Sequence, residues 1–364
     1  MARFAVIGCG NAGAAVAAHL TLLGETATLY DIADNQLAPI IANDNTITLQ
    51  GNIDVTGEAK IALVTKDLGE AVDGAELIIC TTAAHVHKHV ARDLIPHLKD
   101  GQIILLNPGR TGGVLEFQKI FREGGCKADV LVVESQTILY ACRREGAVVN
   151  IFGKKKRVAC SGLPGAELPR FEKIIQRVFP EFVLAEGGIW ATSLDNIGML
   201  FHPTPTLLNL GRMESGQPFD YYIDGFSPSI AALVEELDNE RLQVGRALGV
   251  ELPSAVQWLE TTYGAKGENL YQALQNNVSY QGIKAPMFKE VGDKMGLRYV
   301  IEDVPTGLVP FAELGQKFGV ETPAIRSIIN LANVIYKTDF VADGRSLTQL
   351  GLQEMSSGEI RNLS

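Results

Sequence analysis

Short apolar runs and longer amphipathic runs alternate along the first half of the chain. The short runs are rich in apolar and β-branched residues and end in a turn or polar residue: RFAVIG, TATLYD, AELIICTT, GQIILLN and VLVVES. The segments between them space their apolar residues as helices do: NAGAAVAAHLTLLG, VHKHVARDLIPHL and GVLEFQKIFREG. Strands and helices in this alternation predict a parallel, doubly wound sheet with right-handed crossovers.

Four further runs predict strands outside this alternation. TITLQG and EAKIALV are typical of a small inserted hairpin, and AVVNIFG and KKKRVACSG predict strands added late in the same region. After about residue 187 the strand signals give way to long amphipathic runs with helical spacing: SPSIAALVEELDNERLQVGRALG, SAVQWLETTYG and PFAELGQKFGVETPAIRSIINLANVIY. Because 364 residues exceed what one core usually holds, we predict two domains. The first is an α/β domain over residues 1–187, and the second is all-helical over residues 188–364.

Charge and composition narrow the classes of partner. The chain has 32 Lys and Arg against 42 Asp and Glu, a formal net charge of −10, which disfavours binding to nucleic-acid phosphates. No apolar run reaches the roughly 18 residues that a membrane span needs. The five cysteines are scattered and form no CxxC pair, which indicates reduced thiols, a cytoplasmic location and no metal knuckle: Cys9, Cys80, Cys126, Cys142 and Cys160.

A glycine-rich motif follows the first predicted strand directly and opens an alanine-rich helix. GCGNAG spells G-x-G-x-x-G in the strand–turn–helix context that a dinucleotide-binding, Rossmann-type fold requires. Its first glycine allows a tight turn, the second lets a pyrophosphate approach the backbone, and the third lets helix and strand pack closely. The phosphates would then lie at the helix N-terminus. The alternative is a glycine-rich turn without a ligand. We expect the whole motif to form the cofactor site: Gly8, Cys9, Gly10, Asn11, Ala12 and Gly13.

One acidic residue suggests which dinucleotide binds. Asp31 ends the second predicted strand, 18 residues after Gly13, close to the spacing of an acid that hydrogen-bonds the adenosine ribose. The residues that follow, 32–35, include no cation that could receive a 2′-phosphate. The sequence therefore predicts NAD in preference to NADP.

Two more strand ends should meet at the same edge of the sheet, because ligands of open parallel sheets bind beyond the carboxyl ends of the strands. TTAAHVHKH follows one strand and NPGRTGG follows the next, so we expect Thr82, Asn107, Pro108 and Gly109 to contribute to the cofactor site. The HVHKH run favours a partly exposed first helical turn over a metal site. Only its first and third histidines share a helical face, and no acidic or cysteine ligand accompanies them.

The helical half offers few acid–base groups. His202, in FHPTPTLLN, is the last histidine of the chain, and no lysine lies between Lys173 and Lys266. This gap removes the lysine acid–base group that many two-domain reductases use. From the residues alone, His202 is either a core histidine at a kinked helix or an acid–base group presented to a substrate.

A polar segment about a hundred residues later supplies candidate partners. LRYVIEDVPTGLVP, residues 297–310, contains Arg298, Glu302 and Asp303 before a predicted Pro-Thr-Gly turn. A buried Asp303 could fix the tautomer of an imidazole and raise its basicity, and Arg298 offers a bidentate fork for a carboxylate. The alternative for Arg298 and Asp303 is an ion pair on the surface.

Four segments, in order behind the glycine motif, carry a resemblance: NPGRTGG, ESQTILYACR, HPTPTLLN and IEDVPTGLVP. Over essentially the whole chain the sequence resembles the octopine/nopaline (opine) dehydrogenase family. The resemblance implies an enzyme that joins an α-keto acid to the amine of an amino acid and reduces the imine with NAD(P)H. It implies His202 as the catalytic histidine, Asp303 as its partner and Arg298 as the group that holds a substrate carboxylate. It also places Glu134 and Cys142 on the substrate side.

Two alternatives to this function stay open at this point. A 2-hydroxyacid or ketopantoate-type reductase on the same architecture would need no amine, so it would oxidise NADH with a keto acid alone. A non-catalytic NAD-sensing protein would keep its function after His202→Ala. For the favoured reading we expect an α-keto acid and an amino acid or other amine as partners, no nucleic acid or membrane, and a homodimer as the candidate assembly.

Overall fold

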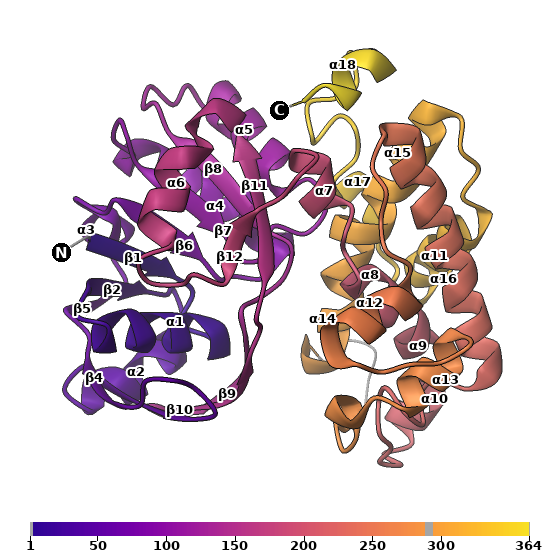
Figure 1. Cartoon of the computed structure of the whole chain (residues 1–364), viewed down its shortest axis with the longest axis horizontal. Helices are drawn as coiled ribbons and strands as arrows, with labels where there is room; N and C mark the ends of the chain where they lie inside the picture. Colours follow the sequence, from indigo (N-terminus) through magenta and orange to yellow (C-terminus); the bar gives the residue numbers. More distant parts are fainter. Residues whose placement is uncertain (1–2, 288–293, 364) are drawn as a thin grey trace. The chain divides into compact units, whose positions relative to one another are not determined.

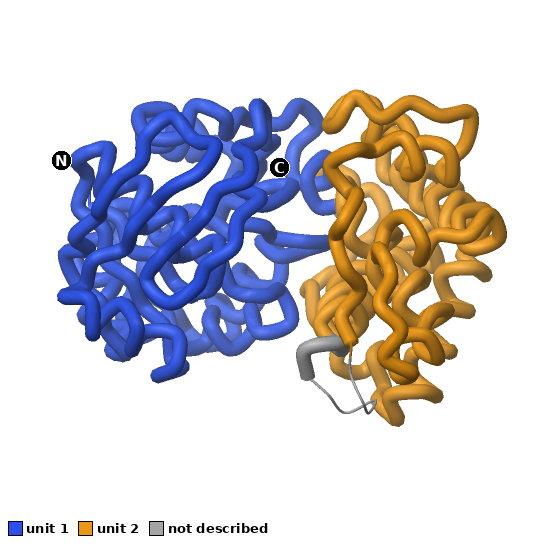
Figure 2. The backbone as a smooth tube through the Cα atoms, turned by 90° about the horizontal axis from the view of Figure 1, so that it is seen from below, with its two compact units in different colours: residues 1–193, 364 blue, residues 194–363 orange. Residues whose placement is uncertain are grey.

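The computed structural model describes residues 3–287 and 294–363, with only the backbone described for 294–297. The chain forms two compact units that divide between Ser193 and Leu194 (Figure 2). This division lies six residues after the predicted boundary at residue 187. The difference arises because helix α7 (Ile189–Ser193) packs on the sheet of the first unit, where the hydroxyls of Thr192 and Ser193 donate to a buried carboxylate.

The first unit is built on an eight-stranded sheet (Figure 1). Its strand order is β12-β11-β8-β7-β6-β1-β2-β5, and the neighbours are parallel except for β11, which is antiparallel to β8. The six strands from β5 to β8 follow the doubly wound order, with the switch point between β1 and β6. The α/β prediction is therefore confirmed. The strands are β1 (Arg3–Ile7), β2 (Thr26–Tyr30), β5 (Leu63–Thr65), β6 (Leu77–Cys80), β7 (Ile103–Leu106), β8 (Leu131–Ser135), β11 (Val158–Leu163) and β12 (Phe182–Leu184).

A second sheet of four strands was not predicted as such. Its order is β4-β3-β10-β9: β3 (Thr46–Gly51), β4 (Gly57–Lys60), β9 (Tyr140–Glu145) and β10 (Val148–Lys154). The predicted hairpin exists as β3 and β4, but the end of the EAKIALV run leaves it and pairs as β5 with β2. The two strands predicted late in the region separate in the same way, with β10 beside β3 and β11 beside β8.

Helix α1 (Asn11–Leu22) contacts both sheets, which explains its composition. Four alanines in its middle, at positions 14, 15, 17 and 18, are fully buried. A helix covered on two sides by sheets needs small side chains if both are to approach closely. The remaining helices of the unit are α2 (Asp34–Ala42), α3 (Leu68–Val72), α4 (His87–Leu94), α5 (Gly113–Glu123) and α6 (Leu168–Ile175).

The same helix carries a buried histidine that makes the first unit sensitive to acid. The Nδ1 atom of His19 lies 2.7 Å from the Tyr140 hydroxyl, and its ring packs on Phe179. Burial lowers the pKa of His19, although the nearby Asp54 carboxylate opposes the shift. The folded unit thus favours the neutral imidazole, so its stability is complete above the ordinary histidine pKa of about 6.5 and falls as the pH drops below it. We expect thermal unfolding between pH 7 and pH 5 to depend less on pH in His19→Asn than in the parent. Equal slopes would contradict this account.

The second unit is helical, as predicted. Its described residues, 194–287 and 294–363, form no sheet. They contain an isolated antiparallel β-bridge between Asp220 and Lys284. No helix in the described part of the chain combines the length and the apolar character of a membrane span. The helices are α8 (Gly198–Phe201), α9 (Pro203–Leu208), α10 (Leu210–Glu214), α11 (Pro228–Leu248), α12 (Ala255–Tyr263), α13 (Leu270–Gln275), α14 (Lys294–Ile301), α15 (Val309–Phe318), α16 (Pro323–Tyr336), α17 (Phe340–Asp343) and α18 (Ser357–Arg361).

The predicted Pro-Thr-Gly turn is wrong. Pro305, Thr306 and Gly307 lie in η5 (Val304–Leu308), a π-helical turn that joins α14 to α15 in one continuous helical path. The Thr306 N–H still donates to the Glu302 carbonyl, at 3.1 Å. The missing N–H of Pro305 is tolerated because Pro305 lies in the first turn of η5, and the Pro305 carbonyl accepts from the Arg345 N–H outside this helical path.

Candidate active site

His202 stands at a break between two short helices of the second unit. Helix α8 ends at Phe201, and α9 begins at Pro203, whose missing N–H is tolerated in the first turn of a helix. The His202 N–H donates to the Gly198 carbonyl, and its own carbonyl accepts from the Thr206 N–H. The backbone therefore stays hydrogen-bonded through the break.

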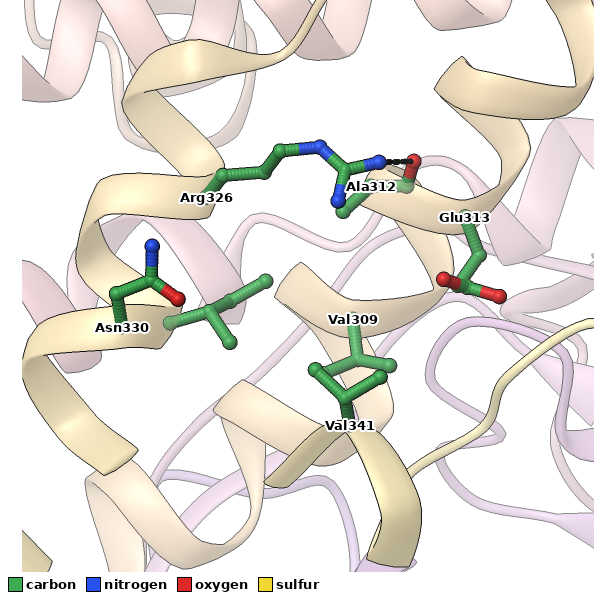
Figure 3. Close-up of a pocket in the computed structure, with 7 residues that line it drawn as sticks. Val309, Ala312, Glu313, Arg326, Asn330 and Val341 are labelled. Carbon is green, nitrogen blue, oxygen red and sulfur yellow. Dashed lines mark hydrogen bonds between the residues drawn. The ribbon is translucent and has the colours of Figure 1, made fainter. Parts of the chain in front are cut away.

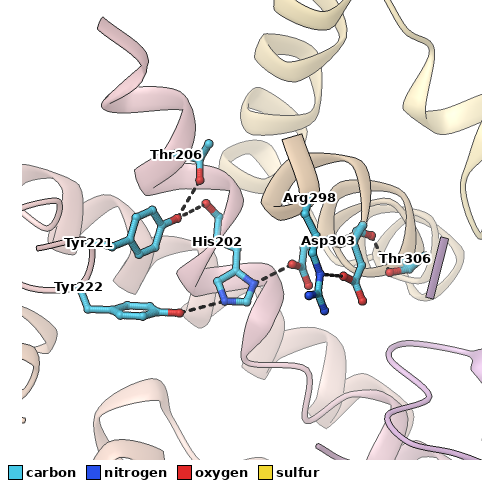
Figure 4. Close-up of polar contacts among 8 residues, drawn as sticks. His202, Thr206, Tyr221, Tyr222, Arg298, Asp303 and Thr306 are labelled. Carbon is cyan, nitrogen blue, oxygen red and sulfur yellow. Dashed lines mark hydrogen bonds and ion pairs between the residues drawn. The ribbon is translucent and has the colours of Figure 1, made fainter. Parts of the chain in front are cut away.

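The structure brings together the histidine and the aspartate that the sequence suggested as partners. His202 Nδ1 lies 2.7 Å from Asp303 Oδ2 (Figure 4). Asp303 is 1 % exposed, whereas the His202 side chain is 18 % exposed. Asp303 directly precedes η5, and this turn packs tightly on α8: a Cβ atom at Gly307 would lie 2.5 Å from the Met199 Cβ. A carboxylate only accepts hydrogen bonds, so Nδ1 is the donor in this pair, and in the neutral form of the imidazole Nε2 then holds the lone pair.

Aromatic side chains surround this dyad, and the sequence analysis missed all of them. The Tyr222 hydroxyl lies 3.1 Å from His202 Nε2, and the Tyr299 ring stacks on the imidazole at a centroid distance of 4.3 Å. The Tyr221 hydroxyl donates to the His202 carbonyl and accepts from Thr206 (Figure 4). The only sequence signal was a pair of adjacent tyrosines in FDYYIDG, which has no periodicity that points to a site.

Arg298 forms an ion pair and also keeps an exposed guanidinium, so it has features of both roles that the sequence left open. Its Nε donates to Glu302 Oε2 at 3.1 Å, four residues later and just beyond the end of α14. Glu302 is almost fully buried, but the Arg298 side chain is 58 % exposed. An ion pair is thus present, and it orients a guanidinium that stays accessible to a carboxylate.

A separate hollow of the second unit shares no residue with the dyad (Figure 3). Its one guanidinium, that of Arg326, already donates to the Ala312 carbonyl and to Gln316. The residues that line it are Val309, Ala312, Glu313, Arg326, Ile329, Asn330 and Val341.

The glycine motif in the first unit has the geometry that a pyrophosphate requires. Gly8 has a φ of +98°, and a Cβ atom on Gly13 would lie 1.7 Å from the Gly8 carbonyl oxygen, so neither position tolerates a side chain. A Cβ atom on Gly10, in contrast, would meet open space. Helix α1 begins at Asn11 without a side-chain cap, which leaves the first-turn N–H groups to an anion. The residues present therefore fit a dinucleotide.

Asp31 is fixed at the end of β2 beside this motif. Its Oδ2 accepts from the Cys9 N–H at 2.7 Å, and its Oδ1 accepts from the Ala33 N–H at 2.9 Å. The following residue, Ile32, is 74 % exposed. The carboxylate thus holds the glycine-rich loop.

The second sheet adds a cation to this site that the sequence analysis missed. The Arg144 N–H, on β9, donates to the Asn11 side chain, and its guanidinium reaches Cys9 Sγ at 3.2 Å and the Gln36 carbonyl at 2.8 Å. Burial raises the pKa of Cys9 to about 11, while the Arg144 charge opposes and the Asp31 charge reinforces the shift. Both charges therefore lie close to this thiol. Arg144 is 113 residues beyond Asp31, so no local pattern could reveal it.

The loops after β6 and β7 lie at the carboxyl edge of the sheet, as predicted. The methyl group of Thr82 borders Gly8, and Thr81 donates to the Gly8 carbonyl. Asn107, Pro108 and Gly109 are buried, and this loop is attached to β8: the Asn107 side chain accepts from Ser135 Oγ, and the Gly109 N–H donates to the Ser135 carbonyl.

In the HVHKH run, His87 is fully buried against Phe117. No group of three or more metal-binding side chains occurs in the described part of the chain.

Two residues that the resemblance assigned to the substrate side are buried. Glu134 is 1 % exposed, and its carboxylate accepts from Thr192, Ser193 and the Val114 N–H at the start of α5. Cys142 lies in the apolar core, and burial raises the pKa of its thiol to about 11. The reason is strand geometry. Glu134 belongs to a central strand buried on both faces, and Cys142 points inward because side chains alternate along β9, a strand that was not predicted.

Comparison with known proteins assigns the family. Residues 185–336 match the model of the NAD/NADP octopine/nopaline dehydrogenase alpha-helical domain, and residues 3–112 match that of the NAD-dependent glycerol-3-phosphate dehydrogenase N-terminus. The chain is 39 % identical to an opine dehydrogenase of Arthrobacter sp. (strain 1C), over 99 % of this chain and 98 % of that protein. The chain belongs to the opine dehydrogenase family. It is also 27 % identical to the vitopine synthase of Allorhizobium ampelinum, over 97 % of this chain and 96 % of the relative.

Solved structures agree with this assignment at the level of the fold. The structure of an octopine dehydrogenase with NADH and L-arginine has a TM-score of 0.80 at 23 % identity, over 98 % of both chains. A putative ketopantoate reductase from Ralstonia solanacearum shares the architecture with a TM-score of 0.62 at 16 % identity, over 93 % of this chain and 99 % of that one. As a member of the opine dehydrogenase family the chain is an oxidoreductase acting on CH–NH donors, and its cofactor is NAD.

Proposed function

We propose that the chain catalyses the NADH-dependent condensation of a pyruvate-like α-keto acid with the amine of an amino acid, and the reverse oxidation. The product is a secondary-amine dicarboxylate. The observation that carries this proposal is the pairing of His202 with a buried Asp303 in a chain that belongs to the opine dehydrogenase family. Relatives named opine dehydrogenase and octopine dehydrogenase, and a structure of the latter with pyruvate, support the substrate classes.

The chain's own residues then have distinct roles in the reaction. When bound, the reduced nicotinamide supplies a hydride to the imine carbon. His202 gives or takes the proton at the substrate nitrogen or carbonyl oxygen. Asp303 holds the Nδ1 proton and stabilises the imidazolium, and the Arg298 fork binds a substrate carboxylate.

A screen of NADH oxidation with amino acids crossed against keto acids tests the proposal. We include norvaline, because the motifs that carry the resemblance are similar to those of bacterial N-(1-carboxyethyl)-norvaline dehydrogenase. Oxidation that requires both a keto acid and an amine supports the proposal. Oxidation with a keto acid alone would instead support the 2-hydroxyacid or ketopantoate-type reductase, which the family comparison does not favour.

The preference for NAD over NADP is a separate prediction. The Asp31 carboxylate would repel a 2′-phosphate, whereas Ile32 is exposed and has room for a cation. We expect Asp31→Ser with Ile32→Arg to shift the ratio of kcat/KM values toward NADPH, with some loss for NADH because Cys9 loses an acceptor. Ile32→Arg alone is the control and should shift the ratio less. If the parent enzyme prefers NADPH, the role given to Asp31 is wrong.

Arg298→Ala should weaken the binding of a carboxylate-bearing substrate. A hydrogen bond to a charged group is worth about 1.5–3 kcal/mol, so we expect its KM to rise about 10- to 100-fold. The KM for NADH should change little, because the predicted cofactor residues all lie in the first unit. Arg298→Lys keeps the charge but loses the fork and should give an intermediate value. Unchanged substrate kinetics would reduce Arg298 to the partner of Glu302.

We further propose that the protein is located in the cytoplasm and that it assembles as a homodimer. All five cysteines are free, which supports a reducing, cytoplasmic compartment. Sedimentation of the purified chain tests the proposed homodimer.

A further inference from the structure

The hydroxyl of Tyr222 is hydrogen-bonded to Nε2 of His202, the ring nitrogen that the proposed reaction needs for proton transfer. His202 Nδ1 is hydrogen-bonded to Asp303, and Nε2 lies 3.1 Å from the Tyr222 hydroxyl on the opposite side of the ring (Figure 4). Since Nδ1 carries the imidazole proton, the Tyr222 O–H donates to the lone pair of Nε2. In this arrangement the tyrosine hydroxyl already engages the lone pair of Nε2.

Tyr222 is held firmly in this position. The segment that carries it pairs with a distant strand-like segment: the Tyr221 N–H donates to the Ile283 carbonyl, and the Ala285 N–H donates to the Phe219 carbonyl. The Tyr222 ring stacks on Tyr280 at a centroid distance of 4.3 Å and is 9 % exposed. These contacts fix the ring, so the hydroxyl is part of the site's framework.

The surroundings keep Tyr222 a neutral phenol. Burial raises its pKa well above the ordinary value of 10, and the neighbouring phenols reinforce the shift: Tyr299, Tyr280, Tyr221 and Tyr263. Among the described residues, His202 faces the Tyr222 hydroxyl and Asp303 lies on the other side of the imidazole, with Arg298 paired to Glu302 nearby. A phenol has one proton to give and lone pairs to accept another, so it can pass a proton without carrying a charge.

We propose that protons pass between His202 and the substrate through the hydroxyl of Tyr222. The proposal rests on the proposed function. In the donating direction the Nε2–H bond breaks and a new O–H bond forms on Tyr222, while the original O–H bond breaks and its proton bonds to the substrate nitrogen or oxygen. The imidazolium becomes neutral, the tyrosine is regenerated, and no electrons are gained or lost. The final state has the Tyr222 O–H directed at Nε2, which is the arrangement in the structure.

Tyr222→Phe and Tyr221→Phe form a matched pair of variants that test this relay. Both remove one hydroxyl and keep the ring, but the Tyr221 hydroxyl binds the His202 backbone carbonyl and not its ring. We expect Tyr222→Phe to lower kcat for reductive condensation about 100-fold, within the range typical of proton transfer by a positioned group. NADH affinity should be unchanged. The dependence of kcat on the D₂O fraction should be curved in the parent, where two protons move, and linear in this variant.

Tyr221→Phe should keep the curved dependence, even if its thermal stability falls. Should Tyr222→Phe fail to fold, 3-fluorotyrosine at position 222 retains the hydroxyl with a more acidic proton, and we then expect the pH profile of kcat to move. A Tyr222→Phe enzyme with the parent kcat, or a fluorotyrosine enzyme with the parent pH profile, would overturn the relay. If His202→Ala is inactive in the same assay, the proposed function survives that result. A His202→Ala enzyme with near-normal kcat would overturn the role of His202 in proton transfer, whereas a parent enzyme that gives no condensation in the substrate screen would overturn the proposed function itself.

Discussion

His202→Ala should lower kcat roughly 10²–10⁴-fold, and adding Asp303→Ala should lower it little further. The two side chains act as one unit, because Asp303 is buried and bonds Nδ1 of the imidazole that transfers the proton. Once the histidine is absent, the aspartate has nothing to orient, so the effects should be strongly non-additive. Steady-state kinetics of the two single variants and the double variant in both directions measure this.

NAD binding should survive in all three dyad variants, since the predicted cofactor residues lie in the first unit and the dyad lies in the second. Fluorescence titration with NADH checks this point. His97→Ala, a histidine of the first unit outside both sites, is the control. The dyad mechanism would be refuted by a His202→Ala enzyme with near-normal kcat in both directions, and His202 would then be a core residue at a kinked helix.

The two directions of the reaction should also differ in their pH optima. Condensation needs the amine as a free base, whereas imine reduction benefits from a protonated His202, and product oxidation needs a neutral His202 that can accept a proton. We therefore expect reductive condensation to peak at a lower pH than oxidation of the product. Profiles of kcat in the parent show this separation, and it should be lost in whatever activity His202→Ala retains.

Glu134→Ala should destabilise the first unit by about 3–5 kcal/mol. The substitution leaves two buried donors without their acceptor, the Ser193 hydroxyl and the Val114 N–H in the first turn of α5, and each such donor costs about 1–3 kcal/mol. It also removes one acceptor of the Thr192 hydroxyl, which keeps the Ile189 carbonyl. Loss of the carboxylate from a helix N-terminus also removes a favourable charge–dipole interaction. Urea unfolding monitored by circular dichroism measures the change.

Two further variants separate this anchoring role from a role in substrate binding. Glu123→Ala removes an exposed carboxylate from the other end of α5 and should have little effect on stability. Glu134→Gln keeps one acceptor oxygen and should be destabilised less than Glu134→Ala. If Glu134→Gln instead raises the KM for the keto acid or the amine at unchanged stability, Glu134 binds substrate, as the resemblance had implied.

The local sequence was sufficient to predict those parts of the site that depend on local backbone geometry. The glycine motif requires a positive φ at Gly8 and a close approach at Gly13, and both requirements appear in the sequence as glycines. His202 and Asp303 could be paired because the helical half offers one histidine and few buried acids near a second motif. Here residue type and rarity, together with the resemblance, indicated the partners.

The errors share one cause, which is that burial and pairing depend on segments far apart in the chain. The resemblance placed Cys142 on the substrate side, whereas its burial follows from β9, a strand that exists through pairing with β10 in a sheet that also needs β3. The Pro-Thr-Gly segment reads locally as a turn. In the structure it continues a helix, because the Arg345 N–H reaches the Pro305 carbonyl and Gly307 packs on Met199.

The sequence by itself predicted the alternation of strands and helices in the first half, the helical second half, the dinucleotide loop and the candidate proton-transferring pair, because periodicity, glycine and rare polar residues act over a few neighbours. Only the tertiary structure decided what surrounds these groups. It placed Arg144 beside Cys9, Tyr222 on Nε2 of His202, and Glu134 beneath the loop after β7. Such contacts join residues 20 to 135 positions apart, and only the packing of a complete core brings them within hydrogen-bond distance.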